Sequence, residues 1–141
     1  ERCYTKYHLQ ALLAGNEIGV LQPDPIHVGG ILEAKKIAAI ADAAYTPVSF
    51  HNPFGPVATA AALQLDACTT NFIMQESFCE YSPAWRFDLL EHPPRPRDGG
   101  YDVSSRPGLG VGRFVVEAAK AHPFDPDAFL PMWVAEWRSK L

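Results

Sequence analysis

The sequence predicts an α/β fold in which parallel strands alternate with helices. Strand and helix periods follow one another in the order β-α-β-α-β between residues 18 and 76, a pattern typical of parallel strands joined by crossover helices. Asp24, His51 and Glu76 lie at the ends of the three expected strands, 27 and 25 residues apart. A strand, its loops and one helix occupy about that many residues, so the three side chains take equivalent places in successive units.

The first half of the pattern contains two expected helices and one strand. Residues 4–15 have helical apolar spacing, and Gly15 is a stop signal. Residues 18–22 then form a short strand. Residues 30–44 form the next helix, with an apolar stripe at helical spacing, which consists of Ala34, Ile37, Ala38 and Ala41.

The second half repeats the same order. Pro47 prevents the helix from continuing, and residues 48–51 form the second strand. Pro56 is well placed in the first turn of a third helix, and residues 72–76 form the third strand. The expected buried side of the third helix consists of Ala58, Ala61, Ala62 and Leu65.

The alternation stops near residue 80, and we divide the chain into residues 1–91 and a tail of residues 92–141. Residues 92–100 are rich in Pro and Gly, which indicates a surface connection. The string RPGLGVG predicts a turn, because no strand–helix unit with an acidic partner surrounds it. A short helix is expected near residues 113–121, followed by aromatic residues for packing or subunit contacts, namely Phe129, Trp133 and Trp137.

Length and charge narrow the class of protein. The 141 residues are 48% apolar, which is enough for one globular unit. A complete (β/α)₈ barrel needs about 250 residues, so the sequence predicts either a smaller α/β fold or part of a larger protein, and we favour the second. The net charge of −4 argues against nucleic-acid binding.

Two further classes are disfavoured by composition. No apolar stretch reaches the roughly 18 residues of a membrane span, and no signal peptide opens the sequence. The three cysteines are an odd number without CxxC spacing. They therefore indicate reduced thiols in a cytoplasmic protein instead of a disulfide frame or a zinc site.

Asp24 and His51 are the principal candidates for chemistry. Adjacent parallel strands are about 4.8 Å apart, so two side chains at their ends can meet. A carboxylate bonded to one imidazole nitrogen fixes the tautomer and leaves the other nitrogen for proton transfer. A histidine at the start of a loop, bonded to whatever lies near, is the plain structural alternative.

Glu76 and His27 are weaker candidates. A lone Glu at the end of an apolar strand is more often a solvated terminus or a helix cap. Beside an anionic substrate in a dry site, Glu76 can instead keep its proton and donate a hydrogen bond to a developing enolate oxygen. His27 lies three residues after Asp24 and is a candidate for substrate contact, although loop or packing roles are commoner at such positions.

Five strings give the sequence a family resemblance. The combination QPDxxHxGG, HxPxGP and QE at these spacings is specific, whereas each motif alone is weak. The chain resembles the C-terminal part of a mandelate-racemase-type member of the enolase superfamily, and most closely its acid-sugar dehydratases of the galactonate dehydratase type. The matching strings are ERCYTKYHLQALL, QPDPIHVGGILEAKKIAAIA, HNPFGPVATAAALQLD, QE and RPGLGVG.

The resemblance implies a fold and a reaction. The expected fold is strands six to eight of a TIM-type (β/α) barrel with their helices. The implied reaction removes water from a galactonate- or gluconate-like sugar acid through an enediolate and gives a 2-keto-3-deoxy acid. His51, oriented by Asp24, would protonate the departing hydroxyl, and Glu76 would contact the substrate. Mg²⁺ would hold the substrate carboxylate, with Glu1 of the Glu1-Arg2 pair as one ligand.

The sequence lacks several parts that the resemblance implies. The first two metal ligands, the second base and the capping domain lie upstream in such enzymes. We therefore expect the 141 residues alone to be inactive and to act with the missing N-terminal part, within a homo-oligomer. A racemase, epimerase or cycloisomerase of the same superfamily is the nearest alternative, and a non-catalytic homologue is another.

Overall fold

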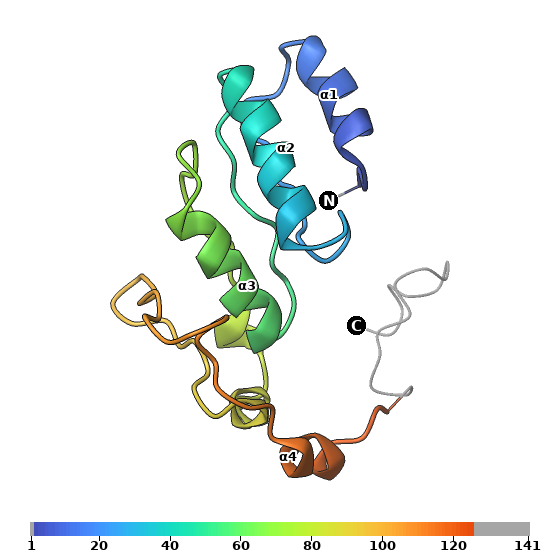
Figure 1. Ribbon diagram of the computed structural model, residues 1–141. Helices are drawn as coiled ribbons and strands as arrows, with labels where there is room; N and C mark the ends of the chain where they lie inside the picture. Colours follow the sequence, from blue (N-terminus) through green and yellow to red (C-terminus); the bar gives the residue numbers. More distant parts are fainter. Residues whose placement is uncertain (1, 126–141) are drawn as a thin grey trace.

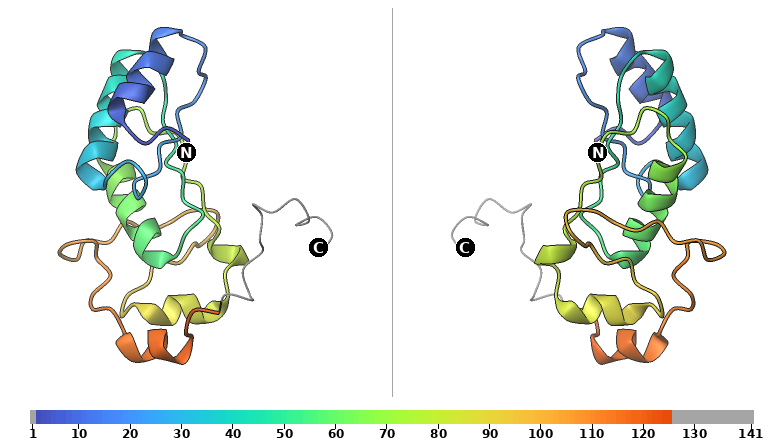
Figure 2. Two further views of the ribbon diagram at one scale, coloured as in Figure 1. Left: turned by 90° about the vertical axis from the view of Figure 1, so that its right-hand side faces the viewer. Right: turned by 90° about the vertical axis from the view of Figure 1, so that its left-hand side faces the viewer.

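Three helices cover one side of three extended segments. The computed structural model describes residues 2–125, and Figures 1 and 2 show α1, α2 and α3 on one side of the extended chain. The predicted helices are all found, with somewhat different ends. The elements are α1 (Lys6–Ala14), α2 (Ile31–Ala43), α3 (Pro56–Ala67), the short 3₁₀ helices η1 (Cys79–Tyr81) and η2 (Ala84–Leu89), and α4 (Val116–Ala121).

The extended segments lie side by side in chain order and are parallel. Val48 forms one parallel bridge with Leu21 and another with Phe72. The main-chain N–H groups of Leu21 and Val48 donate to the carbonyls of Pro47 and Asn71, at 2.9 Å each. The predicted alternation of helices and parallel chain is therefore present.

The prediction of full strands over residues 18–22, 48–51 and 72–76 is wrong for the described part of the chain. Each segment contributes one bridging residue and no longer strand. Proline at position 23 has no N–H to donate to the neighbouring segment, so the ladder after Leu21 loses a bond. On the other side, the Phe50 carbonyl accepts a hydrogen bond from the side-chain amide of Gln75, at 3.0 Å.

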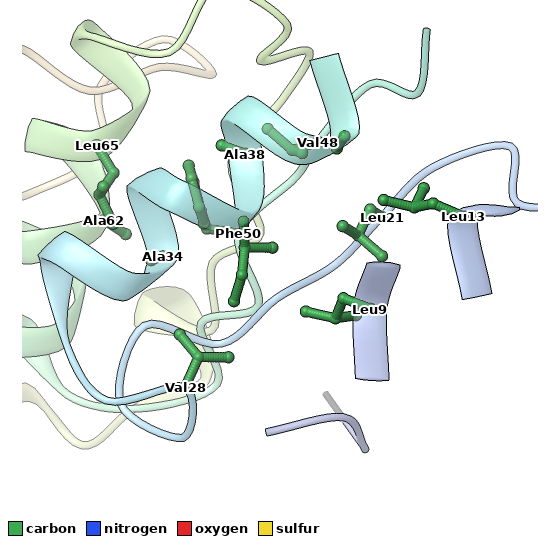
Figure 3. Packing of buried hydrophobic residues seen from close by; sticks show 12 residues of the cluster. Leu9, Leu13, Leu21, Val28, Ala34, Ala38, Val48, Phe50, Ala62 and Leu65 are labelled. Carbon is green, nitrogen blue, oxygen red and sulfur yellow. The ribbon is translucent and has the colours of Figure 1, made fainter. Parts of the chain in front are cut away.

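The core lies between α2 and the extended segments. Val48 and Phe50 are fully buried, and Figure 3 shows Phe50 beside α2 among the other members of the cluster. The small side chains of the predicted stripe allow the helix to lie close to the chain beneath it. All four are buried as predicted: Ala34, Ile37, Ala38 and Ala41.

The predicted buried side of α3 is only half right. Ala62 and Leu65 are buried, whereas Ala58 and Ala61 are half-buried. Ala60 and Leu63 are buried instead on a second side of the helix, where they line a cavity of about 410 Å³ together with residues of the segment 92–111. The tail therefore lies beside α3.

Residues 111–115 hold the tail in place by antiparallel pairing. The N–H of His92 donates to the Val111 carbonyl at 2.9 Å, and that of Val115 to the Leu89 carbonyl at 2.8 Å. The predicted turn in RPGLGVG contains Gly110 at φ 76°, where a Cβ would lie 2.3 Å from the Cβ of Ser104. The predicted aromatic residues Phe129, Trp133 and Trp137 lie outside the described residues.

Three further features concern ionisation, thiols and helix length. The Asp66 carboxylate is buried without a hydrogen bond in the described part of the chain, and desolvation raises its pKa from 3.8 to about 7. All three cysteines are free thiols. Among residues 2–125, no helix is both long and apolar enough to cross a membrane.

Candidate active site

Asp24 is held in a tight turn that follows the first extended segment. Its Oδ1 accepts the main-chain N–H groups of Ile26 at 2.8 Å and of His27 at 3.4 Å, the arrangement of an Asx turn. Gly29 and Gly30 then take φ of 102° and 99°, which a residue with a Cβ rarely adopts. The turn engages Oδ1, and the other carboxylate oxygen, Oδ2, contacts a different residue.

Asp24 and His51 form a close pair. Oδ2 of Asp24 lies 2.7 Å from Nδ1 of His51, within the range of a charge-assisted hydrogen bond. The Asp24 side chain is fully buried, and the His51 side chain is 14% exposed. The main-chain N–H of His51 donates to the Pro23 carbonyl at 3.1 Å. This bond between the two segments fixes the positions of Asp24 and His51 relative to each other. The structure thus brings together the two residues that strand spacing predicted to meet.

Glu76 lies near the other nitrogen of the same imidazole. Its Oε2 is 3.9 Å from Nε2 of His51 and accepts the main-chain N–H of Asn52 at 2.9 Å. Asp24 and Glu76 therefore approach opposite nitrogens of one ring. The three predicted side chains gather at the same end of the extended segments, as equivalent strand ends require.

His27 packs beside this group. Its Nδ1 is 3.4 Å from Oδ2 of Asp24, and its ring makes edge-to-face contacts with Tyr4 and Phe54, at centroid distances of 5.7 and 5.6 Å. The side chain is 39% exposed. These contacts give His27 a packing role in the structure, and its predicted contact with substrate stays a prediction.

A mainly apolar cavity of about 420 Å³ adjoins the pair. Asp24 and His51 line it together with the first residues of α2 and α3. Phe54 also lines the cavity and lies edge-to-face against the His51 ring, at 6.3 Å. The mainly apolar lining lowers the local dielectric beside the pair and so strengthens the electrostatic interaction between the carboxylate and the imidazole.

Sequence reasoning missed Asn52. This side chain is 1% exposed, and its Nδ2 donates to the Thr59 hydroxyl at 3.1 Å and to the Glu76 carbonyl at 3.2 Å. Gln75 donates to the same carbonyl, at 2.7 Å. The only signal in the sequence was the place of Asn52 beside His51, because the contacts depend on chain segments far apart.

The described residues do not form a magnesium site. They contain no group of three His, Cys, Asp or Glu side chains that could hold a metal ion, and Glu1 lies outside them. Both oxygens of Asp24 are already engaged by main-chain amides and imidazole. Magnesium needs several oxygen ligands in octahedral geometry, so these side chains alone do not fit it.

Comparison with known proteins gives the family. Residues 1–112 match the family model described as Enolase C-terminal domain-like, and the chain belongs to this family. The predicted resemblance to the enolase superfamily is thereby confirmed.

Two curated relatives and one solved structure illustrate the similarity. The D-gluconate dehydratase of Thermoproteus tenax is 38% identical over 138 residues, which are 94% of this chain and 28% of that protein. The D-gluconate/D-galactonate dehydratase of Picrophilus torridus is 40% identical over 111 residues, or 79% of this chain and 28% of the relative. The chain thus spans less than a third of the length of these relatives.

The solved structure adds a different activity. It is a candidate L-alanine-DL-glutamate epimerase from Burkholderia xenovorans strain LB400, bound to magnesium and fumarate. The TM-score is 0.77 at 30% identity, and the match covers 86% of this chain and 29% of that one. Dehydration and epimerisation therefore both occur among the names of similar proteins.

Proposed function

We propose that the whole protein that carries this chain removes water from a gluconate- or galactonate-like sugar acid. The product is a 2-keto-3-deoxy acid. The observation that carries the proposal is the 2.7 Å contact between Asp24 and His51, with Glu76 3.9 Å from the other imidazole nitrogen. The dehydratases among the curated relatives support the substrate class.

In the proposed reaction, His51 is the general acid. The Asp24 carboxylate accepts a hydrogen bond from Nδ1–H and stabilises the doubly protonated imidazole. A base from a part of the protein outside this chain first takes the proton on C2, which gives the enediolate. Nε2 of His51 then gives its proton to the 3-hydroxyl, which leaves as water when the C3–O bond breaks. The resulting enol becomes the 2-keto acid by proton transfer to carbon.

Glu76 is proposed to bind an oxygen of the substrate. Oε2 already accepts the N–H of Asn52, whereas Oε1 makes no hydrogen bond to residues 2–125. A protonated Glu76 donates from Oε1 to the developing enolate oxygen, which lowers the energy of the charged intermediate. His27 is the second candidate for substrate contact.

The fold and partners of the whole protein are part of the same proposal. We assign the extended segments to strands six to eight of a TIM-type barrel, with residues 1–91 in the barrel and residues 92–141 as a tail that packs on the barrel or on a missing N-terminal capping domain. The remaining strands, the second base and a capping domain come from outside this chain, and the protein forms a homo-oligomer. Magnesium with Glu1 as one ligand remains a prediction, and no step above depends on it.

A product assay tests the proposal. The whole protein and the 141-residue chain are each incubated with a panel of sugar acids, and 2-keto acids are detected with semicarbazide. We expect a semicarbazone only from the whole protein. Robust turnover by the 141-residue chain alone contradicts the proposal that part of the active site lies outside this chain. Absence of a keto acid from the whole protein contradicts the proposed dehydration.

An epimerase is the second candidate, because the solved relative from Burkholderia xenovorans is a candidate epimerase. The same Asp24–His51 pair would then deliver a proton to carbon in place of a hydroxyl. Proton NMR of the incubated sugar acids separates the two reactions. An epimer gives a new diastereomer and no semicarbazone, whereas a non-catalytic homologue leaves every spectrum unchanged.

A further inference from the structure

Asn52 forms hydrogen bonds with both the side chain and the main chain of Glu76. Its main-chain N–H donates to the Glu76 carboxylate at 2.9 Å, and its side-chain Nδ2 donates to the Glu76 carbonyl at 3.2 Å. The same Nδ2 donates to Oγ1 of Thr59 on α3 at 3.1 Å. Thr59 is fully buried, and its hydroxyl also lies 3.4 Å from the Gly55 carbonyl. One residue therefore ties the Glu76 backbone, the Glu76 carboxylate and a helix together.

The orientation of the Asn52 amide follows from these partners. A carbonyl oxygen only accepts hydrogen bonds, so the NH₂ group must face Glu76. Oδ1 is then buried without a partner among the described residues. A buried unpaired acceptor is destabilising and offsets part of what the two Nδ2 hydrogen bonds contribute.

Asn52 is also the residue directly after His51. The planar peptide between them carries the N–H that holds the Glu76 carboxylate, so a shift of Asn52 changes the separation of Glu76 from the imidazole. We propose that Asn52 is a positioning residue that sets the 3.9 Å separation between Oε2 of Glu76 and Nε2 of His51. The inference rests on the proposed function and deepens it.

A matched control lies at the other end of the same segments. The side chain of Asn71 donates to the carbonyls of Ala38 and Thr46, at 3.2 and 2.9 Å. It is an amide that likewise ties neighbouring segments together, but it makes no contact with Asp24, His51 or Glu76. Removal of the Asn71 amide therefore shows how much activity is lost when an amide between segments is removed without any change at the site.

The kinetic test compares Asn52→Leu, Asn52→Ala and Asn71→Leu in the whole protein, with rates normalised to folded protein. Displacement by about 1 Å can cost roughly 100-fold, so both Asn52 variants are expected to lower kcat about 10- to 100-fold and to change KM less than about threefold. Asn71→Leu is expected to keep kcat within about twofold. Equal losses of kcat at positions 52 and 71 overturn the proposal.

A double-mutant cycle with Glu76→Gln isolates the coupling. If Asn52 acts through Glu76, Asn52→Ala lowers kcat much less in the Glu76→Gln background than in the unaltered protein. Additive losses overturn the proposal.

A crystal structure of Asn52→Ala in the whole protein tests the inference without activity. The Glu76 carboxylate is expected to move relative to His51, and an unchanged separation overturns the proposal. If the whole protein has no dehydratase activity, the proposed function is refuted. The crystal structure of Asn52→Ala still shows in that case whether Asn52 positions Glu76.

Discussion

Replacement of Asp24 by Asn tests the central contact of the site. The two oxygens of Asp24 have different partners: Oδ1 accepts two main-chain N–H groups, and Oδ2 faces Nδ1 of His51. An asparagine has one oxygen, and the main-chain donors require it. The NH₂ group must then face His51, where it opposes the Nδ1–H of a doubly protonated imidazole.

The magnitude follows from the hydrogen bond that is lost. A hydrogen bond to a charged group contributes about 1.5–3 kcal/mol, and each 1.36 kcal/mol is about tenfold in rate. The contact is short and the carboxylate is fully buried, so solvent does not replace it. We expect Asp24→Asn to lower kcat for dehydration by about 10- to 150-fold in the whole protein.

The assay measures kcat and KM by semicarbazone formation, with the folded fraction from circular dichroism. Asp42→Asn is the matched control, because Asp42 is an exposed carboxylate on α2 that accepts a hydrogen bond from the Thr70 hydroxyl at 3.3 Å. The control is expected to stay within about twofold. A folded Asp24→Asn protein within threefold of the unaltered kcat would refute the assigned role of the pair.

Three other substitutions have expected outcomes. Glu76→Gln leaves an oxygen for the N–H of Asn52 and replaces the carboxylic O–H donor by a weaker amide N–H donor, so kcat is expected to fall about 10- to 100-fold in steady-state kinetics. Burial raises the pKa of Asp66 to about 7, so unfolding releases a proton and the free energy of unfolding falls as pH rises from about 4 to 7. Urea unfolding measures the free energy of unfolding of the unaltered protein and of Asp66→Asn. Between about pH 5 and pH 8 the unaltered protein should lose about 1–2 kcal/mol more than the variant, after allowance for solvent screening. The same pH dependence in both proteins would contradict this. Gly110→Ala is expected to lower the free energy of unfolding by about 1–3 kcal/mol, because its Cβ would lie 2.3 Å from that of Ser104 at positive φ. Gly19→Ala, with open space around it, is the control and should change stability by less than about 0.5 kcal/mol.

The sequence was sufficient where a short-range pattern decides the structure. The α2 stripe was predictable because a helix places every third and fourth residue on one side. Asp24, His51 and Glu76 were predictable as neighbours because parallel segments end at the same edge, whatever their side chains do elsewhere. Their functional roles remain proposals that the kinetic tests address.

Long-range packing decided the features that sequence patterns missed. The second buried side of α3 depends on a tail that begins 25 residues after the helix ends. The contacts of Asn52 join it to Thr59 and to Glu76, 24 residues away. No local period encodes such pairs, so their prediction needs the relative placement of all three segments.

The sparse pairing near Pro23 has a consequence for the site. Because Pro23 cannot donate, the segments carrying Asp24 and His51 are joined there by one main-chain bond, from His51 N–H to the Pro23 carbonyl. The Asp24–His51 hydrogen bond is the next link along the same edge. The contact assigned to proton transfer therefore also holds the two segments together, and its removal must affect stability as well as rate. For this reason kcat is normalised to folded protein, and Asn71→Leu serves as a second control beside Asp42→Asn, because it also removes a contact between neighbouring segments.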